Sequence, residues 1–454
     1  MDEEFRYQGH WWLPGAGEHS VPGIVEFKPD KGTTLNLMGS LKGLEGIVDP
    51  IEPEIILGLS SDGKLLTLRD CAKILGNLRF GSGFSTSTFV ANTVFVGEHF
   101  ERPEDVGFER LVVEYLHLGA WADATGFDIK FVEETEEPKR RWIEMKHELP
   151  EAATASVGGE YEVTLDFGSD FEASKRPFTW AKINQPAELA IKFPEKQPFD
   201  RLRDIVFRLQ HLLSLGMRRS AYPVAIRGYT GVPGEAMPVE VPYSPLGRMD
   251  NVERPERFEM LFSRRDLPGG FVAAFARWLE RAGDLDPVYR LFLGTVYNPR
   301  SYLEQRFLNL VQALEVYHRR ALYVPELPKE EHERRVREIL NAIPAEHKGW
   351  LERKLQVVSE PSLNQRLYEI FKRHRGIVES VIDKKKQIRA EFIERVVATR
   401  NYRTHFDDSK KDKAARGEEL YQIMRKLNLV LEACLMEEIG FSPEKTKDAI
   451  SGMR

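Results

Sequence analysis

The chain has 454 residues, 42% of them apolar and 30% charged, which is typical of globular proteins and excludes collagen-like, mucin-like and disordered classes. No apolar run reaches the ~18 residues that span a bilayer, and the acidic N-terminus lacks the apolar stretch of a secretory signal, so we expect a cytoplasmic protein without membrane contact. Two cysteines, Cys71 and Cys434, are too few for a disulfide framework or a cysteine-based zinc site.

The net charge of −6 is unevenly divided along the chain. Residues 300–454 hold 31 Lys and Arg against 25 Asp and Glu, a net of +6, which leaves −12 for residues 1–299. A basic C-terminal part predicts an anionic partner there. The alternative is that charge simply varies between domains.

The N-terminal part alternates short β-branched and aromatic runs with Gly, Pro, Asn and Asp turns, which predicts strands. The predicted strands cover 23–27, 33–39, 54–59, 84–97, 108–118, 160–167 and 187–193, with strand-like runs at 222–230 and 237–245. One predicted helix interrupts them at 199–217, where apolar residues recur at helical spacing and Asp200 is placed to cap the first turn.

Helical periodicity replaces the strand pattern from about residue 268. The predicted helices cover 269–283, 301–322, 328–344, 362–382, 384–406 and 418–440, the first of them ending at Gly283. We therefore predict an α+β fold with a β-rich domain over 1–265, a helical linker region over 266–299 and an all-α helical bundle over 300–454.

The β-rich part contains no phosphate-binding loop, nucleophile elbow or zinc-protease motif. Its tryptophans offer a stacking platform for a sugar or base, or else they are core and half-buried packing residues, which we favour. They are Trp11, Trp12, Trp121, Trp142 and Trp180. No histidine or acidic cluster has metal-ligand spacing, so we expect no metal and no cofactor.

The informative segment is Arg400-Asn401-Tyr402-Arg403-Thr404-His405. An Arg and a following His with four to six residues between them resemble the signature of the HEPN ribonucleases, although that pair alone also recurs in the chain by chance. The other matches are Arg110/His117, Arg140/His147 and Arg141/His147. Only the Arg400 match has an Asn directly after the Arg and lies in a predicted helix of the bundle.

Residue types in this segment suit RNA cleavage. Asn401 and His405 are four apart and share one helix face, and the long Arg400 side chain can reach the same place. RNA supplies its own nucleophile, the 2′-hydroxyl, so His405 would serve as general acid or base and Arg400 would stabilise the phosphate charge. The alternative is a plain helix end with a solvated Arg403 and a His near the helix C-terminus.

Basic residues surround the motif. Residues 371–416 carry 14 Lys and Arg against 7 Asp and Glu, which is typical of a surface that binds a polyanion, although lysine-rich loops are usually just solvated. The lysines that we expect to bind RNA are Lys384, Lys385, Lys386, Lys410 and Lys411.

Two segments, 307–320 and 392–406, resemble the ApeA-type HEPN domain, and the stretch 108–127 with the Trp-rich opening resembles the ApeA N-terminal domain. The resemblance implies a bacterial anti-phage protein whose HEPN domains pair as a homodimer and cleave RNA. Glu315 and Arg403 are candidate auxiliary residues, whereas we expect His318 to be a surface residue. Ala398 departs from related motifs, which commonly hold an acidic residue there.

The sequence therefore predicts a metal-independent endoribonuclease that stops growth of infected cells by cleaving RNA, with tRNA as the first substrate to test and a phage-derived activator as its trigger. Two alternatives stay open. The bundle could be a non-catalytic module that binds RNA or a protein, or the β-rich domain could be the functional part, as a ligand or phage sensor.

Overall fold

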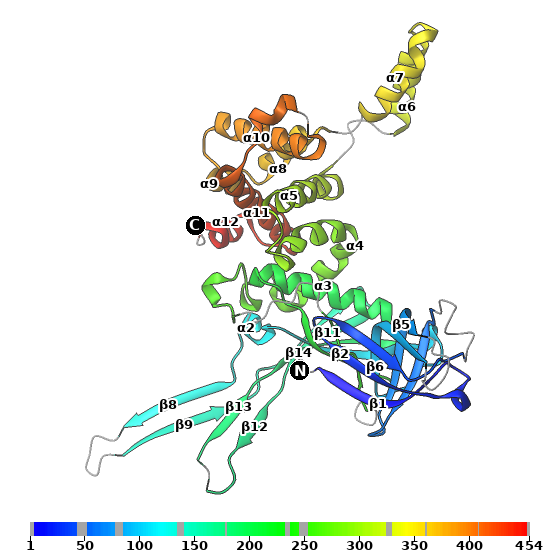
Figure 1. The fold of residues 1–454 in the computed structure, drawn as a ribbon. Helices are drawn as coiled ribbons and strands as arrows, with labels where there is room; N and C mark the ends of the chain where they lie inside the picture. Colours follow the sequence, from blue (N-terminus) through cyan, green and yellow to red (C-terminus); the bar gives the residue numbers. More distant parts are fainter. Residues whose placement is uncertain are drawn as a thin grey trace. The chain divides into compact units, whose positions relative to one another are not determined.

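The structure of the chain is a computed structural model, shown in Figure 1. It describes residues 4–42, 52–77, 85–133, 140–177, 179–231, 237–244, 253–323, 329–358, 361–406 and 408–451. The chain divides into two compact units, Met1–Glu280 and Arg281–Arg454. The first unit is rich in strands and the second is helical, so the predicted α+β class is confirmed.

Six antiparallel strands of the first unit close into a barrel, because β6 pairs with both β3 and β5. Around the barrel the order is β6, β3, β2, β1, β4 and β5. Their bounds are β1 Phe5–Trp12, β2 Val21–Lys28, β3 Gly32–Leu37, β4 Ile55–Ser60, β5 Leu65–Asn77 and β6 Thr86–Val96. Alternate residues point inward, and these inward side chains form one buried core.

Trp11 lies at the centre of this barrel core and is fully buried. Its indole covers Gly58 of β4, where an added Cβ would come within 2.2 Å of the ring. A glycine is therefore required opposite Trp11, and this pairing leaves that tryptophan no face for a ligand.

A further run of strands extends from β6 through a short β16 as an open sheet in the order β10, β11, β14, β7, β15 and β16. Their bounds are β7 Gly107–Tyr115, β10 Ala153–Val157, β11 Tyr161–Phe167, β14 Ala187–Pro198, β15 Pro223–Tyr229 and β16 Val239–Glu240. Helix α3 (Phe199–Met217) packs on β7 and β14, as its predicted apolar stripe requires. The strand predicted at 108–118 ends earlier, at Tyr115, and after a two-residue turn the short helix α2 (Leu118–Ala122) begins.

Asp200 does not cap α3. The N-cap position is Pro198, and the Asp200 carboxylate accepts a 2.6 Å bond from Arg69 of β5 and also pairs with Arg203. The prediction was wrong because the acidic residue lies inside the first turn, where it ties the helix to the barrel instead.

Two antiparallel ribbons are separate from the large sheet and can be followed in Figure 1. The first ribbon consists of β8 (Phe127–Glu133) and β9 (Arg141–His147), and the second of β12 (Asp170–Ala173) and β13 (Ala181–Asn184). The second ribbon continues the register of β11 and β14.

The helical unit includes α5 Leu303–Tyr317, α6 Lys329–Asn341, α7 Ala345–Val358, α8 Leu363–Arg373, α9 Arg375–Val381, α10 Lys386–His405, α11 Gly417–Ile439 and α12 Pro443–Ser451. Helix α5 packs on α11, and α10 contacts both α5 and α8. In the helix predicted at 418–440 the apolar residues at helical spacing are all buried, whereas Ile388, an apolar residue at the start of α10, is exposed. The buried set is Leu420, Met424, Leu427, Leu431 and Cys434.

Three helix predictions need correction. Helix α4 runs without interruption over Gly270–Tyr297, past the predicted end at Gly283, because its buried apolar face continues through Leu285 and Phe292. The helix predicted at 362–382 is two helices, since the chain leaves helical geometry at His374. Helix α5 ends at Tyr317 and is followed by one π-helical turn.

Candidate functional site

Helix α10 carries the Arg-Asn-x-x-x-His segment on its last two turns. Buried Ile393 and Val396 anchor the helix to its neighbours. The Thr399 hydroxyl is also buried, where it donates to the Arg395 carbonyl at 2.7 Å and accepts from the Ala415 N–H at 2.9 Å. This side chain ties the motif-bearing turn to the segment that leads into α11.

The helix ends immediately after His405. Phe406 adopts a left-handed conformation with φ +50°, and its N–H donates to the Tyr402 carbonyl at 2.7 Å. His405 is exposed on the last turn, while Arg400 and Asn401 are partly buried. A ligand can therefore reach the His405 imidazole from solvent. The Arg400 and Asn401 side chains, which are partly buried, are less accessible than the imidazole.

Arg400 contacts both a neighbour in its own helix and a residue of α5. Its Nη1 donates to Asn401 Oδ1 at 3.2 Å, and its Nη2 donates to Glu315 Oε2 of α5 at 3.4 Å. The Arg400 and Glu315 side chains are 30% and 24% exposed, so the pair is half-buried. The structure thus brings Glu315, one of the two predicted auxiliary residues, to the motif arginine.

Arg403 also pairs with α5 rather than standing in solvent. Its Nη2 lies 3.3 Å from Glu304 Oε1, and its side chain is only 18% exposed. Arg403 and Arg416 each lie near the Tyr402 ring, at 5.7 and 5.8 Å from its centroid. Two arginines and a tyrosine therefore flank the motif with cationic and aromatic groups.

Two family models match the chain, ApeA N-terminal domain 1 over residues 6–278 and Apea-like HEPN over residues 308–445. The first match alone covers more than half of the chain. The chain belongs to the ApeA-type HEPN family. This confirms the resemblance drawn from the sequence and gives the protein the anti-phage context of its family. No curated protein and no solved structure matches it.

In this HEPN unit Ala398 leaves α10 without an acidic residue two positions before Arg400. The carboxylate that faces Arg400 comes from α5, 85 residues earlier in the chain. Helical periodicity could place Glu315 on the side of α5 next to the buried stripe, but only the packing of α5 on α10 could show which residue it meets.

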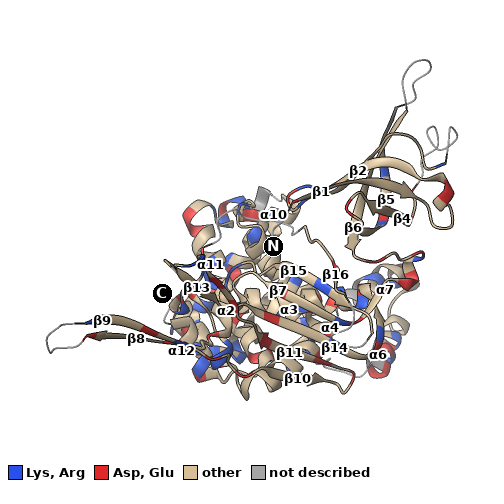
Figure 2. Cartoon of the chain, turned by 90° about the horizontal axis from the view of Figure 1, so that it is seen from below, with Lys and Arg blue, Asp and Glu red and all other residues tan. Residues whose placement is uncertain are grey.

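The lysines predicted to bind RNA are not gathered at the motif. Lys384, Lys385 and Lys386 are exposed at the other end of α10, about 21 Å from Arg400 at 1.5 Å per residue. Lys411 is exposed near the start of α11, and the Lys410 side chain lies outside the described residues. Basic and acidic residues are interspersed on the helices of the unit (Figure 2).

His318 is fully buried, which corrects the expected surface position. Its Nε2 lies 2.5 Å from Glu369 Oε2, and its Nδ1 lies 3.4 Å from the Nη1 of buried Arg366. Both partners come from α8, and no pattern in the sequence pointed to either. The prediction failed because His318 continues the buried stripe of α5, four residues after Leu314 and seven after Val311, and that stripe stays covered past Tyr317.

A second buried polar cluster surrounds the end of α11. Tyr317 donates to Glu438 at 3.1 Å, and Arg281 pairs with the same carboxylate at 3.0 Å. His374 Nδ1 lies 3.4 Å from Glu437, and burial lowers the pKa of this histidine. These groups join α4, α5, α8 and α11, so their role is to hold the bundle together.

The tryptophans of the β-rich unit do not form one platform. Trp11 and Trp121 are fully buried, whereas Trp142 and Trp180 are 44% and 53% exposed on different ribbons. The packing interpretation therefore holds for the buried pair.

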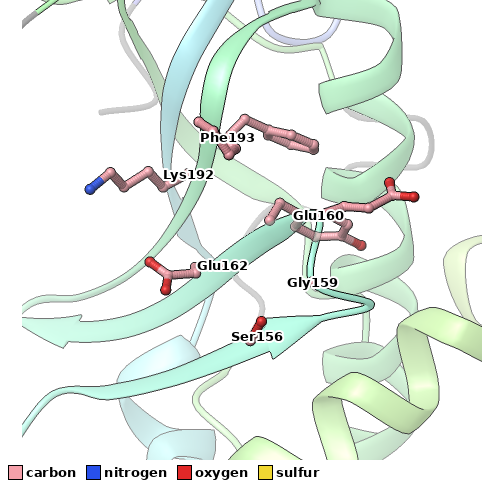
Figure 3. A pocket seen from close by; sticks show the side chains of 8 residues that line it. Ser156, Gly159, Glu160, Glu162, Lys192 and Phe193 are labelled. Atoms are coloured by element: carbon pink, nitrogen blue, oxygen red, sulfur yellow. The ribbon is translucent and has the colours of Figure 1, made fainter.

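A surface pocket of about 280 Å³ opens at the turn between β10 and β11 (Figure 3). Glu160, Glu162 and Lys192 line it beside the Tyr161 and Phe193 rings, which stack at 4.8 Å. Opposite charges on its wall give no single preference for a ligand.

Within the described ranges, no three His, Cys, Asp or Glu side chains are grouped as metal ligands would be. In the same part of the chain, no helix has the length and apolar character needed to cross a membrane.

Proposed function

We propose that this ApeA-type HEPN protein is a metal-independent endoribonuclease of bacterial anti-phage defence. His405 transfers protons, Arg400 stabilises charge on the reacting phosphate and Asn401 positions the phosphate or the imidazole. The observation that carries the proposal is an exposed imidazole five residues, about 1.4 turns, after an arginine that Glu315 and Asn401 hold in place.

The reaction needs two proton transfers. The 2′-hydroxyl of RNA gives its proton to one neutral imidazole and attacks the adjacent phosphorus. The bond from phosphorus to the 5′ oxygen breaks, and a protonated imidazole gives that oxygen its proton. The products are a 2′,3′-cyclic phosphate and a 5′-hydroxyl, and the arginine stabilises the charge of the transition state.

One motif supplies one histidine, so base and acid come most simply from two copies. A two-fold interface repeats the same patch on both subunits and would place two motifs opposite each other. We therefore propose a homodimer formed through the HEPN unit. Arg403, with its guanidinium beside Tyr402, would bind a flanking phosphate.

The substrate we propose is structured RNA with an exposed loop, such as a tRNA anticodon stem-loop, because in-line attack needs an unstacked nucleotide. Such a target places the protein in the cytoplasm.

A phage-derived activator is the proposed trigger, because an unrestrained ribonuclease would harm its host. Lys384, Lys385 and Lys386, far along α10, would contact the phosphates of a longer RNA.

The test is to express the wild type, His405→Ala and a matched control, His347→Ala, in cells and to sequence RNA 5′-hydroxyl ends. His347 is an exposed histidine on α7 that pairs only locally with Glu346. We expect new 5′-hydroxyl ends in the wild type and the control, and a loss of about 10²–10⁴-fold in His405→Ala. Equal cleavage by purified His405→Ala would refute the assignment, and RNA binding without cleavage by the wild type would favour a non-catalytic module.

A further inference from the structure

The first ribbon has one apolar face that the described residues leave uncovered. In β8 and β9 the pairs Ile129/Met145 and Phe131/Ile143 lie on the same side of the ribbon. These four side chains are 47–80% exposed, and Phe131 is the most exposed. The opposite face carries the charged pairs Asp128/Lys146 and Lys130/Glu144 and, next to the hairpin end, the pair Val132/Trp142. The apolar side ends there in the ion pair Glu133/Arg141. A two-stranded ribbon is marginally stable by itself, so an exposed face of this kind gains from a partner.

The second ribbon has the same construction. Phe171 pairs with Ile183, and Ala173 pairs with Ala181, on one side of β12 and β13. Phe171 is 67% exposed. The other side carries the pair Glu172/Lys182.

The apolar sides of the two ribbons are turned toward each other at their bases. His147 lies on the apolar side of the first ribbon, opposite Phe127. Its ring nitrogens lie 3.3 Å from Ser169 and 3.3 Å from Gln185. Ser169 and Gln185 directly flank the last pair of the second ribbon, Asp170/Asn184, and strand alternation continued by one residue puts them on the side of Phe171 and Ile183. Gln185 also binds the Gly126 N–H at 2.7 Å, which fixes the two bases together.

We propose that these two facing apolar surfaces bind one extended protein segment that has apolar side chains on both of its faces. A strand sends successive side chains to opposite sides, so a single strand between the ribbons would fill both surfaces at once. Both ribbons are two-stranded, and their outer backbone edges can also pair with an added strand.

The exposed area favours a segment over a second copy of the chain. With side-chain areas of about 150–250 Å², the exposed parts of the four first-ribbon side chains and Phe171 amount to on the order of 600 Å². A stable protein–protein interface buries about 800 Å² on each partner. The two apolar surfaces are therefore too small for a stable dimer interface of about 800 Å² on each partner. They suit a peptide of about seven residues, the length of β8.

Charge argues against a nucleic acid or an anionic membrane. The strands of the first ribbon hold three acidic residues and three basic ones, and residues 134–140 between them add three Glu against one Lys and one Arg. A surface without excess positive charge gives a polyanion no electrostatic attraction.

The proposal is tested by fluorescence anisotropy with the full chain and a labelled peptide of about seven Val, Ile and Phe residues flanked by Lys. A second peptide with Ser and Thr at the apolar positions is the comparison. We expect the apolar peptide to bind, and Phe131→Ser and Phe171→Ser each to weaken binding roughly ten- to a hundredfold. The control Phe258→Ser removes a 78% exposed phenylalanine outside both ribbons and should change nothing.

Several outcomes would overturn the proposal. These are no binding of the apolar peptide, equal binding of both peptides, or weakening by only one of the two ribbon variants. If sedimentation shows that Phe131→Ser converts a dimer to a monomer, the surface binds a second copy of the chain. Binding to phosphatidylcholine or phosphatidylglycerol vesicles that depends on Phe131 would assign it to a membrane. Because both side chains are exposed, we expect thermal unfolding of the variants to match that of the wild type.

Discussion

Replacing Glu315 by Gln tests whether the carboxylate from α5 positions Arg400 for catalysis. The Oε2 to Nη2 distance of 3.4 Å corresponds to a Coulomb attraction of about 5 kcal/mol at an effective dielectric constant of 20. Both groups are roughly one-quarter exposed or more, so desolvation and screening reduce the net value to about 1 kcal/mol. Losing that restraint should lower kcat about fivefold, because 1.4 kcal/mol is tenfold.

The same change should tighten RNA binding. A phosphate bound to the far side of the Arg400 guanidinium would lie about 7 Å from the carboxylate, and repulsion at that distance costs about 0.6–1 kcal/mol in a solvated site. Glu315→Gln removes that repulsion, so KM should fall about threefold while kcat falls. A fall in both kcat and KM would show that Glu315 positions Arg400. If Glu315 only stabilised the fold, kcat and KM of the folded fraction would stay unchanged.

The assay is cleavage of a fluorophore–quencher stem-loop RNA, measured above and below KM for Glu315→Gln, Arg400→Ala and the double variant. Glu346→Gln, which removes an exposed carboxylate on α7, is the charge-matched control. We expect the Glu315→Gln effect to vanish in the Arg400→Ala background, since the two residues act as one unit. Independent, additive effects in the double variant would refute the reasoning.

Three further predictions follow from burial and from the proposed chemistry. Burial lowers the pKa of His374 below its usual 6.5 despite the neighbouring Glu437. The neutral imidazole therefore contributes fully to the stability of the fold above about pH 6.5, and this contribution is lost as the pH falls. The thermal unfolding temperature of His374→Gln should depend less on pH between 7.5 and 5.5 than that of the wild type. Burial raises the pKa of Cys71 to about 12 and that of fully buried Cys434 well above its usual value, so a thiol reagent at pH 8 should react with neither until denaturant is added. RNA cleavage should persist in EDTA, and loss of activity that Mg²⁺ restores would contradict the proposed mechanism.

The elements that the sequence predicted well are those whose burial follows a single helical stripe. Helix α3 begins and ends at the predicted residues, and α10 and α11 lie within two residues of their predicted bounds. Their apolar residues recur every three or four positions, and local spacing alone determines which face is buried.

The spacing of apolar residues in one segment could not predict contacts between segments that are far apart in the sequence. The approach of Glu315 to Arg400 depends on how α5 crosses α10, and the polar partners of buried His318 come from α8, about 50 residues later in the chain. The ribbons were missed for a different reason: their apolar residues alternate as in a strand, but no core covers them, so β8 and β9 lack the surroundings that usually identify a strand. Barrel closure between β5 and β6 is likewise invisible in either strand alone.

That closure has a consequence for how the protein is made on the ribosome. Strand β1, the first to emerge, ends up between β2 and β4, and the barrel cannot close until β6, ending at Val96, has left the exit tunnel. Until then β3 and β5 each have an open edge, and open edges recruit other chains. Nascent chains stalled before that point should therefore be the most prone to aggregate, and deleting the first dozen residues would remove a central strand rather than a dispensable tail.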